Sequence, residues 1–125
     1  ARFLSPDRDS HAAQPVDLDE ALEAVDGDGE LLREGVKLFL EYDYPRHLEA
    51  LRKGLERKDA RAVKAAAHGI KGVVGSFGGQ AAHRAALRLE TMGRRDDLSD
   101  AQGVLEELQA EMERFADFFA QTECD

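Results

Sequence analysis

A histidine and a lysine lie on one side of a predicted helix, within the run Ala67-His68-Gly69-Ile70-Lys71-Gly72. At about 100° of rotation per residue, the apolar residues of this segment fall on one stripe of the helix. The stripe consists of Val63, Ala66, Ala67, Ile70, Val73, Val74 and Phe77. His68 points almost directly away from Ile70, so the spacing predicts an imidazole that faces water and not the core.

Three glycines interrupt the same predicted helix, namely Gly69, Gly72 and Gly75. Each costs roughly 1 kcal/mol relative to alanine in a helix interior, and two of them lie on the exposed side, where no packing offsets that cost. A close approach by another molecule is the better reason for them. Lys64 and Lys71 lie one turn before and one turn after His68, so their ammonium groups reach the region of the imidazole. An exposed nucleophilic nitrogen beside cations and bare backbone is suited to hold a phosphoryl group, and a merely solvated histidine is the alternative.

The run from Ala67 to Gly72, with Gly78 ten residues after the histidine and Leu89-Glu90 further on, resembles the signature of histidine-containing phosphotransfer (HPt) domains. The similarity covers roughly residues 16 to 120. The resemblance implies that His68 accepts a phosphoryl group from a receiver-domain aspartate and passes it reversibly to another receiver in a two-component phosphorelay. The implied partners are receiver domains of response regulators or of a hybrid histidine kinase. It further implies a phosphocarrier without an ATP site or kinase activity, and without a cofactor or metal of its own, because Mg²⁺ is expected on the receiver.

The predicted docking surface surrounds His68 on the exposed side of the helix. It consists of Arg61, Gly69, Gly72, Gly75, Ser76 and Gly78, with Lys71 and Lys64 stabilising the phosphoryl group. Ser76 stands where the family often has asparagine, and Gly75 is an additional glycine, so both affect the shape of this surface. Arg61, Lys64 and Lys71 also form a basic spot that suits an acidic partner.

Glu90 is the predicted orienter of the imidazole. If the chain turns near Gly78 and Gly79, antiparallel pairing brings residues 88–90 alongside His68. A carboxylate that accepts a hydrogen bond from the Nδ1 proton would leave Nε2 outward as the nucleophile. The alternative is that Glu90 is a solvated residue or pairs with Arg94 one turn later.

The remaining segments show helical periodicity, and no strand-like alternation competes with it. Asp17, Asp28 and Asp59 are predicted helix caps, and Ser99 is predicted to open the last helix. The predicted helices cover residues 17–25, 28–55 with an interruption or kink at Pro45, 59–77, 82–93 and 99–119. Short loops between long amphipathic helices favour an all-α fold, an antiparallel four-helix bundle with a short extra N-terminal helix across one end.

Length and composition predict a single domain of residues 16–121, preceded by a linker or flexible arm (1–15) and followed by a C-terminal tail (122–125). The net charge of -9 argues against nucleic acid or an anionic membrane as a partner. There is no apolar run that could cross a bilayer, so no membrane insertion is expected. The single cysteine, Cys124, indicates a reducing cytoplasm, and we expect a monomer.

Competing motifs fail on spacing. The run Asp26, Asp28, Glu30 resembles a calcium loop, but Leu31 occupies the position that needs glycine. The other histidines, His11, His47 and His83, are predicted to be ordinary surface or boundary residues. With these motifs excluded, the second functional hypothesis is a non-catalytic helical interaction domain. Such a domain would dock a partner through the face around His68 without being phosphorylated.

Overall fold

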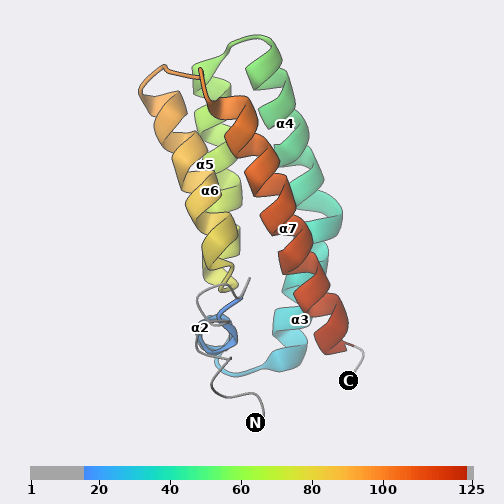
Figure 1. The fold of residues 1–125 in the computed structure, drawn as a ribbon. Helices are drawn as coiled ribbons and strands as arrows, with labels where there is room; N and C mark the ends of the chain where they lie inside the picture. Colours follow the sequence, from blue (N-terminus) through green and yellow to red (C-terminus); the bar gives the residue numbers. More distant parts are fainter. Residues whose placement is uncertain (1–15, 124–125) are drawn as a thin grey trace.

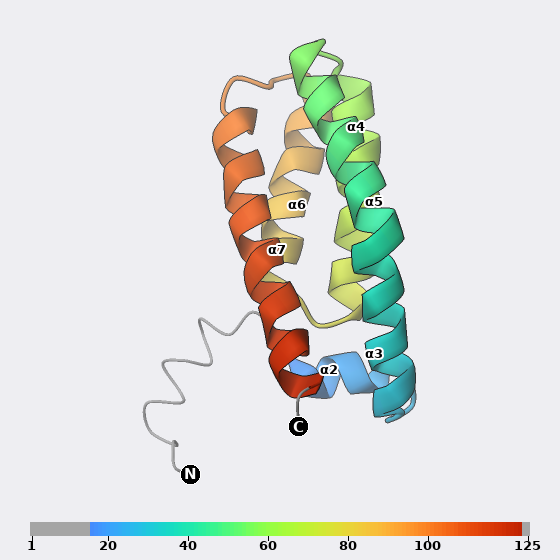
Figure 2. The same ribbon diagram turned by 90° about the vertical axis from the view of Figure 1, so that its right-hand side faces the viewer.

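The computed structural model describes residues 16–123, and the predictions for residues 1–15, including His11, and for Cys124 fall outside them. The elements are α2 (Leu18–Glu23), α3 (Gly29–Leu38), the π-helical η1 (Phe39–Asp43), α4 (Tyr44–Glu56), α5 (Ala60–Ser76), α6 (Gln80–Arg94) and α7 (Ala101–Glu123). The continuous rod α3–η1–α4 packs with α5, α6 and α7 as an antiparallel bundle, and α2 lies across one end (Figures 1 and 2). The all-α fold is confirmed. Helix α7 runs two residues into the predicted C-terminal tail.

The three predicted aspartate caps are present. Each carboxylate, of Asp17, Asp28 and Asp59, accepts a hydrogen bond at 3.0 or 3.1 Å from the backbone N–H three residues later. Such a cap stabilises a helix by about 1 kcal/mol. Asp59 fixes the start of α5, the helix that carries His68, and Gly78, with a φ of +75°, follows its end.

Pro45 does not interrupt the second long helix, so of the two predicted outcomes, an interruption or a kink, the interruption is wrong. A proline ring clashes with the carbonyl four residues earlier and lacks an N–H. Here the backbone widens just before Pro45, and the Tyr44 N–H bonds to the Phe39 carbonyl five residues back. This π-helical segment accommodates the ring, so α3, η1 and α4 follow one another without a loop.

Ser99 does not open the last helix, which begins at Ala101. The Ser99 hydroxyl and backbone N–H donate to the Asp97 carboxylate at 2.7 and 3.2 Å, so this serine closes a turn within the preceding loop. Because Ser99 donates to Asp97 within the loop, the last helix begins two residues later than predicted.

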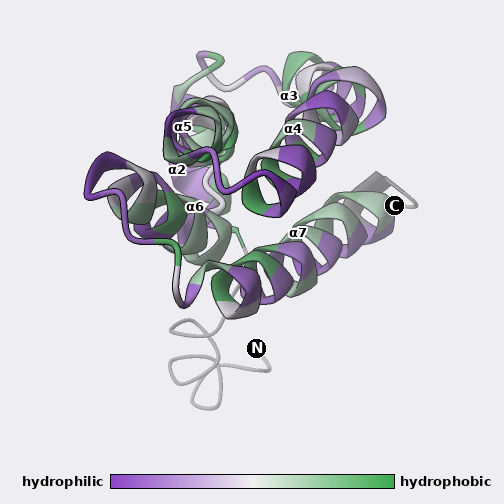
Figure 3. Cartoon of the chain, turned by 90° about the horizontal axis from the view of Figure 1, so that it is seen from above, coloured by the Kyte–Doolittle hydropathy of each residue, from purple (hydrophilic) through white to green (hydrophobic). Residues whose placement is uncertain are grey.

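The apolar stripes of the long helices meet inside the bundle. Figure 3 shows hydrophobic (green) and hydrophilic (purple) residues alternating along each long helix, as expected of helices with one buried side. The largest fully buried side chains include Phe39, Leu51, Ile70, Leu89, Leu108 and Phe115. Among residues 16–123, none of the helices is long and apolar enough to cross a membrane.

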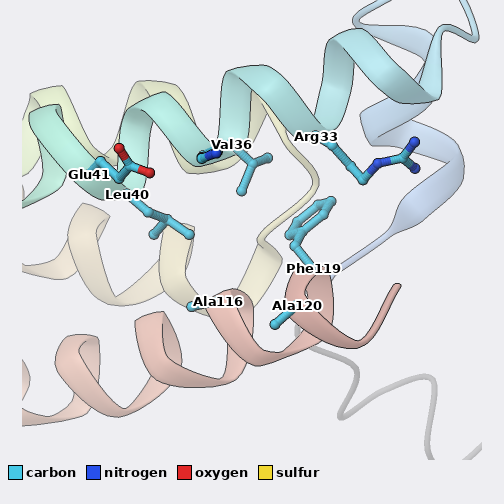
Figure 4. A pocket seen from close by; sticks show the side chains of 8 residues that line it. Arg33, Val36, Leu40, Glu41, Ala116, Phe119 and Ala120 are labelled. Atoms are coloured by element: carbon cyan, nitrogen blue, oxygen red, sulfur yellow. The ribbon is translucent and has the colours of Figure 1, made fainter. Parts of the chain in front are cut away.

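A cavity of about 290 Å³ lies between the α3–η1 part of the rod and α7 (Figure 4). Its lining includes Val36, Leu40 and Phe119, with Arg33 and Glu41 at the sides. None of the residues that line it belongs to the predicted site around His68.

Candidate functional site

His68 is exposed because the opposite side of α5 is buried. Val63, Ala67 and Ile70 have no exposed surface, since α4 and α6 pack on either side of this helix. The packing fixes the rotation of α5, and the His68 side chain is 66% exposed. The structure thus places the imidazole where the spacing predicts it.

Glu90 reaches His68 from the neighbouring helix. The turn around Gly78 folds α6 back along α5, and the Glu90 Oε2 atom lies 2.8 Å from His68 Nδ1. Glu90 itself is only 4% exposed, so it is not a solvated surface residue. Arg94 also lies 3.4 Å from Oε2, so the alternative pairing with Arg94 exists beside the contact with His68.

Lys71 contacts the other oxygen of the same carboxylate, at 2.7 Å from Nζ to Oε1. The contacts with Lys71 and then with His68 lower the pKa of Glu90, against the opposite effect of its burial. An ionised carboxylate has no proton to donate, so the His68 Nδ1–H is the donor in the 2.8 Å contact. In the neutral ring Nε2 is then the unprotonated nitrogen, on the side of the ring away from Glu90.

The three glycines of α5 differ in their surroundings. A Cβ atom at Gly72 would meet nothing within 4 Å, so this glycine does leave bare, exposed backbone. A Cβ at Gly69 would lie 2.6 Å from Cε1 of His47, and one at Gly75 would lie 3.0 Å from Cδ2 of His83. Gly69 and Gly75 therefore make room for rings of this chain, and this is a reason for these two glycines other than the predicted close approach of another molecule.

His47 is a neighbour of the site that the sequence analysis missed. It comes from α4, and its half-buried ring covers Gly69, the residue next to His68. Burial, together with the nearby Arg46, lowers the pKa of His47 and favours its uncharged form. No signal in the sequence points to this contact, because it depends on which turn of α4 lies opposite Gly69.

Gly78 does not belong to the exposed surface, contrary to the prediction. It is buried in the α5–α6 turn, where its carbonyl accepts a 2.7 Å hydrogen bond from the Asp17 N–H. A Cβ here would clash with the Asp17 carbonyl oxygen, and the φ of +75° also favours glycine. Ser76 is exposed, and its hydroxyl donates to the Gly72 carbonyl at 3.1 Å.

Residues 34–118 match the family model of the Hpt domain. The chain belongs to the Hpt domain family. Its fold is similar to the crystal structure of histidine-containing phosphotransfer protein B (HptB) from Pseudomonas aeruginosa PAO1, with a TM-score of 0.80 and 23% identity over 88% of this chain and 95% of that chain. No curated protein sequence matches the chain. Hpt domains are phosphocarrier modules of phosphorelays, not kinases, and they interact with receiver domains of response regulators.

In this Hpt domain the predicted basic spot extends beyond α5. Arg61 and Lys64 are exposed and line an open hollow together with Arg57, Lys58 and Arg94, and these five cations outnumber the two carboxylates of the lining, Asp59 and Asp96. The hollow lies where the α4–α5 turn meets the end of α6. Helices α5 and α6 approach closely there, since a Cβ at Gly93 would lie 2.7 Å from the Ala60 carbonyl oxygen. One end of the His68 face is therefore basic in a chain of net charge -9.

Proposed function

We propose that Nε2 of His68 is the phosphoacceptor, which takes a phosphoryl group from a receiver aspartate and returns it to the same or another receiver. The observation that carries this proposal is the contact between His68 Nδ1 and Glu90, since it leaves the exposed ring's other nitrogen as the nucleophile.

In the forward step the Nε2 lone pair attacks phosphorus, a P–N bond forms, and the aspartate carboxylate leaves as the P–O bond breaks. The proton stays on Nδ1, so the phosphorylated ring carries a positive charge, which the ionised Glu90 stabilises at 2.8 Å. The reverse step transfers the group to a receiver carboxylate by the same geometry.

The cations near His68 have two roles in this proposal. Lys64 is exposed one turn from His68 and reaches an incoming phosphoryl group directly. Lys71 is ion-paired with Glu90 and neutralises the charge of that carboxylate. In this proposal its ammonium group also keeps a positive charge close to the phosphoryl group. The chain supplies no ATP site in this proposal, and Mg²⁺ belongs to the receiver.

The test is incubation with a ³²P-labelled receiver domain, followed by acid and base treatment of the labelled chain. Phosphohistidine is acid-labile and base-stable. We expect the wild type and His83→Gln to be labelled and His68→Gln to remain unlabelled with an unchanged circular dichroism spectrum. Label on His68→Gln would refute the assignment. Receiver binding by an unlabelled wild type would favour the non-catalytic interaction domain.

A further inference from the structure

The cavity between the α3–η1 part of the rod and α7 has an apolar floor and a charged rim (Figure 4). Val36 and Phe119 are buried at its floor, and Leu40 is half-buried beside them. The volume of about 290 Å³ is about twice the roughly 150 Å³ of an apolar cavity that binds one benzene molecule. The cavity is therefore at the lower end of the size range of small-molecule sites and can hold an apolar body of about ten carbon atoms.

The cavity exists because α7 presents small side chains to the rod at this level. Ala116 and Ala120 lie one turn apart on the side of α7 that faces Val36 and Leu40 (Figure 4). Protein interiors leave few voids larger than a water molecule, and an unfilled apolar cavity lowers stability. Leu40 also belongs to the π-helical segment, and such segments frequently occur at functional sites. A ligand in this space would supply contacts that these side chains do not make with one another.

Two cations at the rim lack a partner in the part of the chain that the structure describes. Arg33 and Lys37 lie one turn apart on α3, and neither forms an ion pair or a side-chain hydrogen bond within residues 16–123. Arg33 is half-buried, and its guanidinium lies at one end of the row of apolar side chains, whereas the Glu41 carboxylate lies at the other end (Figure 4). A carboxylate near Arg33 would accept charge-assisted hydrogen bonds. A second negative charge at the far end would be repelled by Glu41.

We infer that this cavity binds a small amphiphilic carboxylate with a single negative charge. Its apolar body lies among the apolar side chains between α3–η1 and α7, and its carboxylate is bound by Arg33 and Lys37. The cavity shares no lining residue with the site around His68, so the inference does not depend on the proposed function. A bound ligand connects the rod to α7 and stabilises the folded domain as its concentration rises above the Kd.

The experiment titrates the chain with decanoate and with 2-naphthoate, which carry an alkyl and an aromatic body, respectively. Concentrations stay below those at which decanoate forms micelles, and binding is followed by ¹⁵N NMR and by the rise in Tm. Decyltrimethylammonium has the same alkyl chain with a positive charge, and decanedioate has a second carboxylate at its far end. The variant Arg33→Gln/Lys37→Gln removes both cations, and Ala116→Leu fills the cavity. The matched control, Arg57→Gln/Lys58→Gln, removes two exposed cations at the opposite end of the bundle.

We expect at least one of the two carboxylates to bind with a Kd of about 0.1–1 mM and to shift the NMR signals of α3, η1 and residues 116–120. Arg33→Gln/Lys37→Gln should weaken binding at least tenfold, and Ala116→Leu should abolish it, while the matched control should bind as the wild type does. Decyltrimethylammonium and decanedioate should bind at least tenfold more weakly than decanoate. Glu41→Gln should reduce the difference between decanoate and decanedioate.

The absence of binding by both carboxylates would overturn the inference. Wild-type affinity in both Ala116→Leu and Arg33→Gln/Lys37→Gln would also overturn it, as would an equal loss in the matched control. NMR shifts confined to the surroundings of Leu55 and Leu98, which line another hollow at the far end of the bundle, would place the binding elsewhere and refute this site. A dimer that decanoate dissociates would assign the cavity to a second copy of the chain instead.

Discussion

Replacing Glu90 with glutamine should both destabilise the bundle and slow transfer. The side chain is buried, and its carboxylate lies 2.7 Å from Lys71, 2.8 Å from His68 and 3.4 Å from Arg94. Removing one partner of a buried pair costs about 3–5 kcal/mol when the other partner stays buried. Here His68 and Arg94 are 66% and 54% exposed and can rehydrate. Lys71 is only 23% exposed but can still donate to the glutamine carbonyl, so the expected loss for Glu90→Gln is about 1–3 kcal/mol. In a domain of this size that lowers Tm by about 4–12 °C.

The loss should depend on pH in a defined direction. The contacts with Lys71 and His68 lower the pKa of Glu90 below its ordinary value of 4.5. A carboxylate with a lowered pKa stabilises the folded state at pH values above the pKa in the unfolded chain, and this stabilisation disappears as the pH falls through the folded-state pKa. Urea denaturation from about pH 7 to about pH 3 should therefore show the largest difference between wild type and Glu90→Gln at neutral pH, and a shrinking difference in acid.

The same substitution has a readout at the imidazole. The glutamine carbonyl still accepts from Nδ1–H, so Glu90→Gln should retain some transfer, whereas Glu90→Leu should lose about tenfold to a hundredfold and show a mixture of His68 tautomers by ¹⁵N NMR. The matched control is Glu107→Gln, because Glu107 pairs with Arg88 at 2.6 Å but is 55% exposed and should contribute less than about 1 kcal/mol. A Glu90→Gln protein as stable as Glu107→Gln at every pH, with transfer unchanged in Glu90→Leu, would refute the reasoning.

The glycines give further predictions, each measured by urea denaturation. Gly72→Ala should stabilise the domain by about 0.5–1 kcal/mol, because the added Cβ meets nothing within 4 Å and alanine favours the helix. Gly69→Ala should stabilise the domain less than Gly72→Ala, since the Cβ would lie 2.6 Å from the end of the His47 ring, which must turn away. Adding His47→Ala should remove that difference. Gly93→Ala should cost about 1–3 kcal/mol, because the Ala60 carbonyl at 2.7 Å is backbone and cannot rotate away. A destabilised Gly72→Ala, or a Gly69→Ala as stable as Gly72→Ala, would contradict these assignments.

Local rules were sufficient to predict most of the fold. The apolar stripe of α5 has the period of a helix, and the caps at Asp17, Asp28 and Asp59 depend only on donors three residues later. Pro45 is a position where local rules were not sufficient. Whether a proline breaks a helix or is accommodated by a π-helical turn depends on the packing on both sides of it, and here α3 and α4 remain one rod.

The part of the site that could be predicted, the pairing of His68 with Glu90, depends only on the short turn between α5 and α6. Counting back from the turn at Gly78 is enough to pair Glu90 with His68, because α5 and α6 are adjacent in the chain. The ring over Gly69 belongs to His47 of α4, and its position depends on the register between two helices, which residue types alone do not specify. For the same reason the sequence could not distinguish the open Gly72 from the covered Gly69.

The burial of Glu90 explains how a histidine on the surface can have a fixed orientation. An exposed imidazole bonded to an exposed carboxylate would exchange that bond for water at little cost. Glu90 is held by the α5–α6 packing, so its carboxylate stays in place, and burial without partners would favour its neutral form. The contacts with Lys71 and His68 counter that effect. The charges of Lys71, Arg94 and Glu90 together leave one net positive charge beside the imidazole. The arrangement thus keeps Nδ1 bonded to a carboxylate without presenting a net negative charge to the phosphoryl group that approaches Nε2.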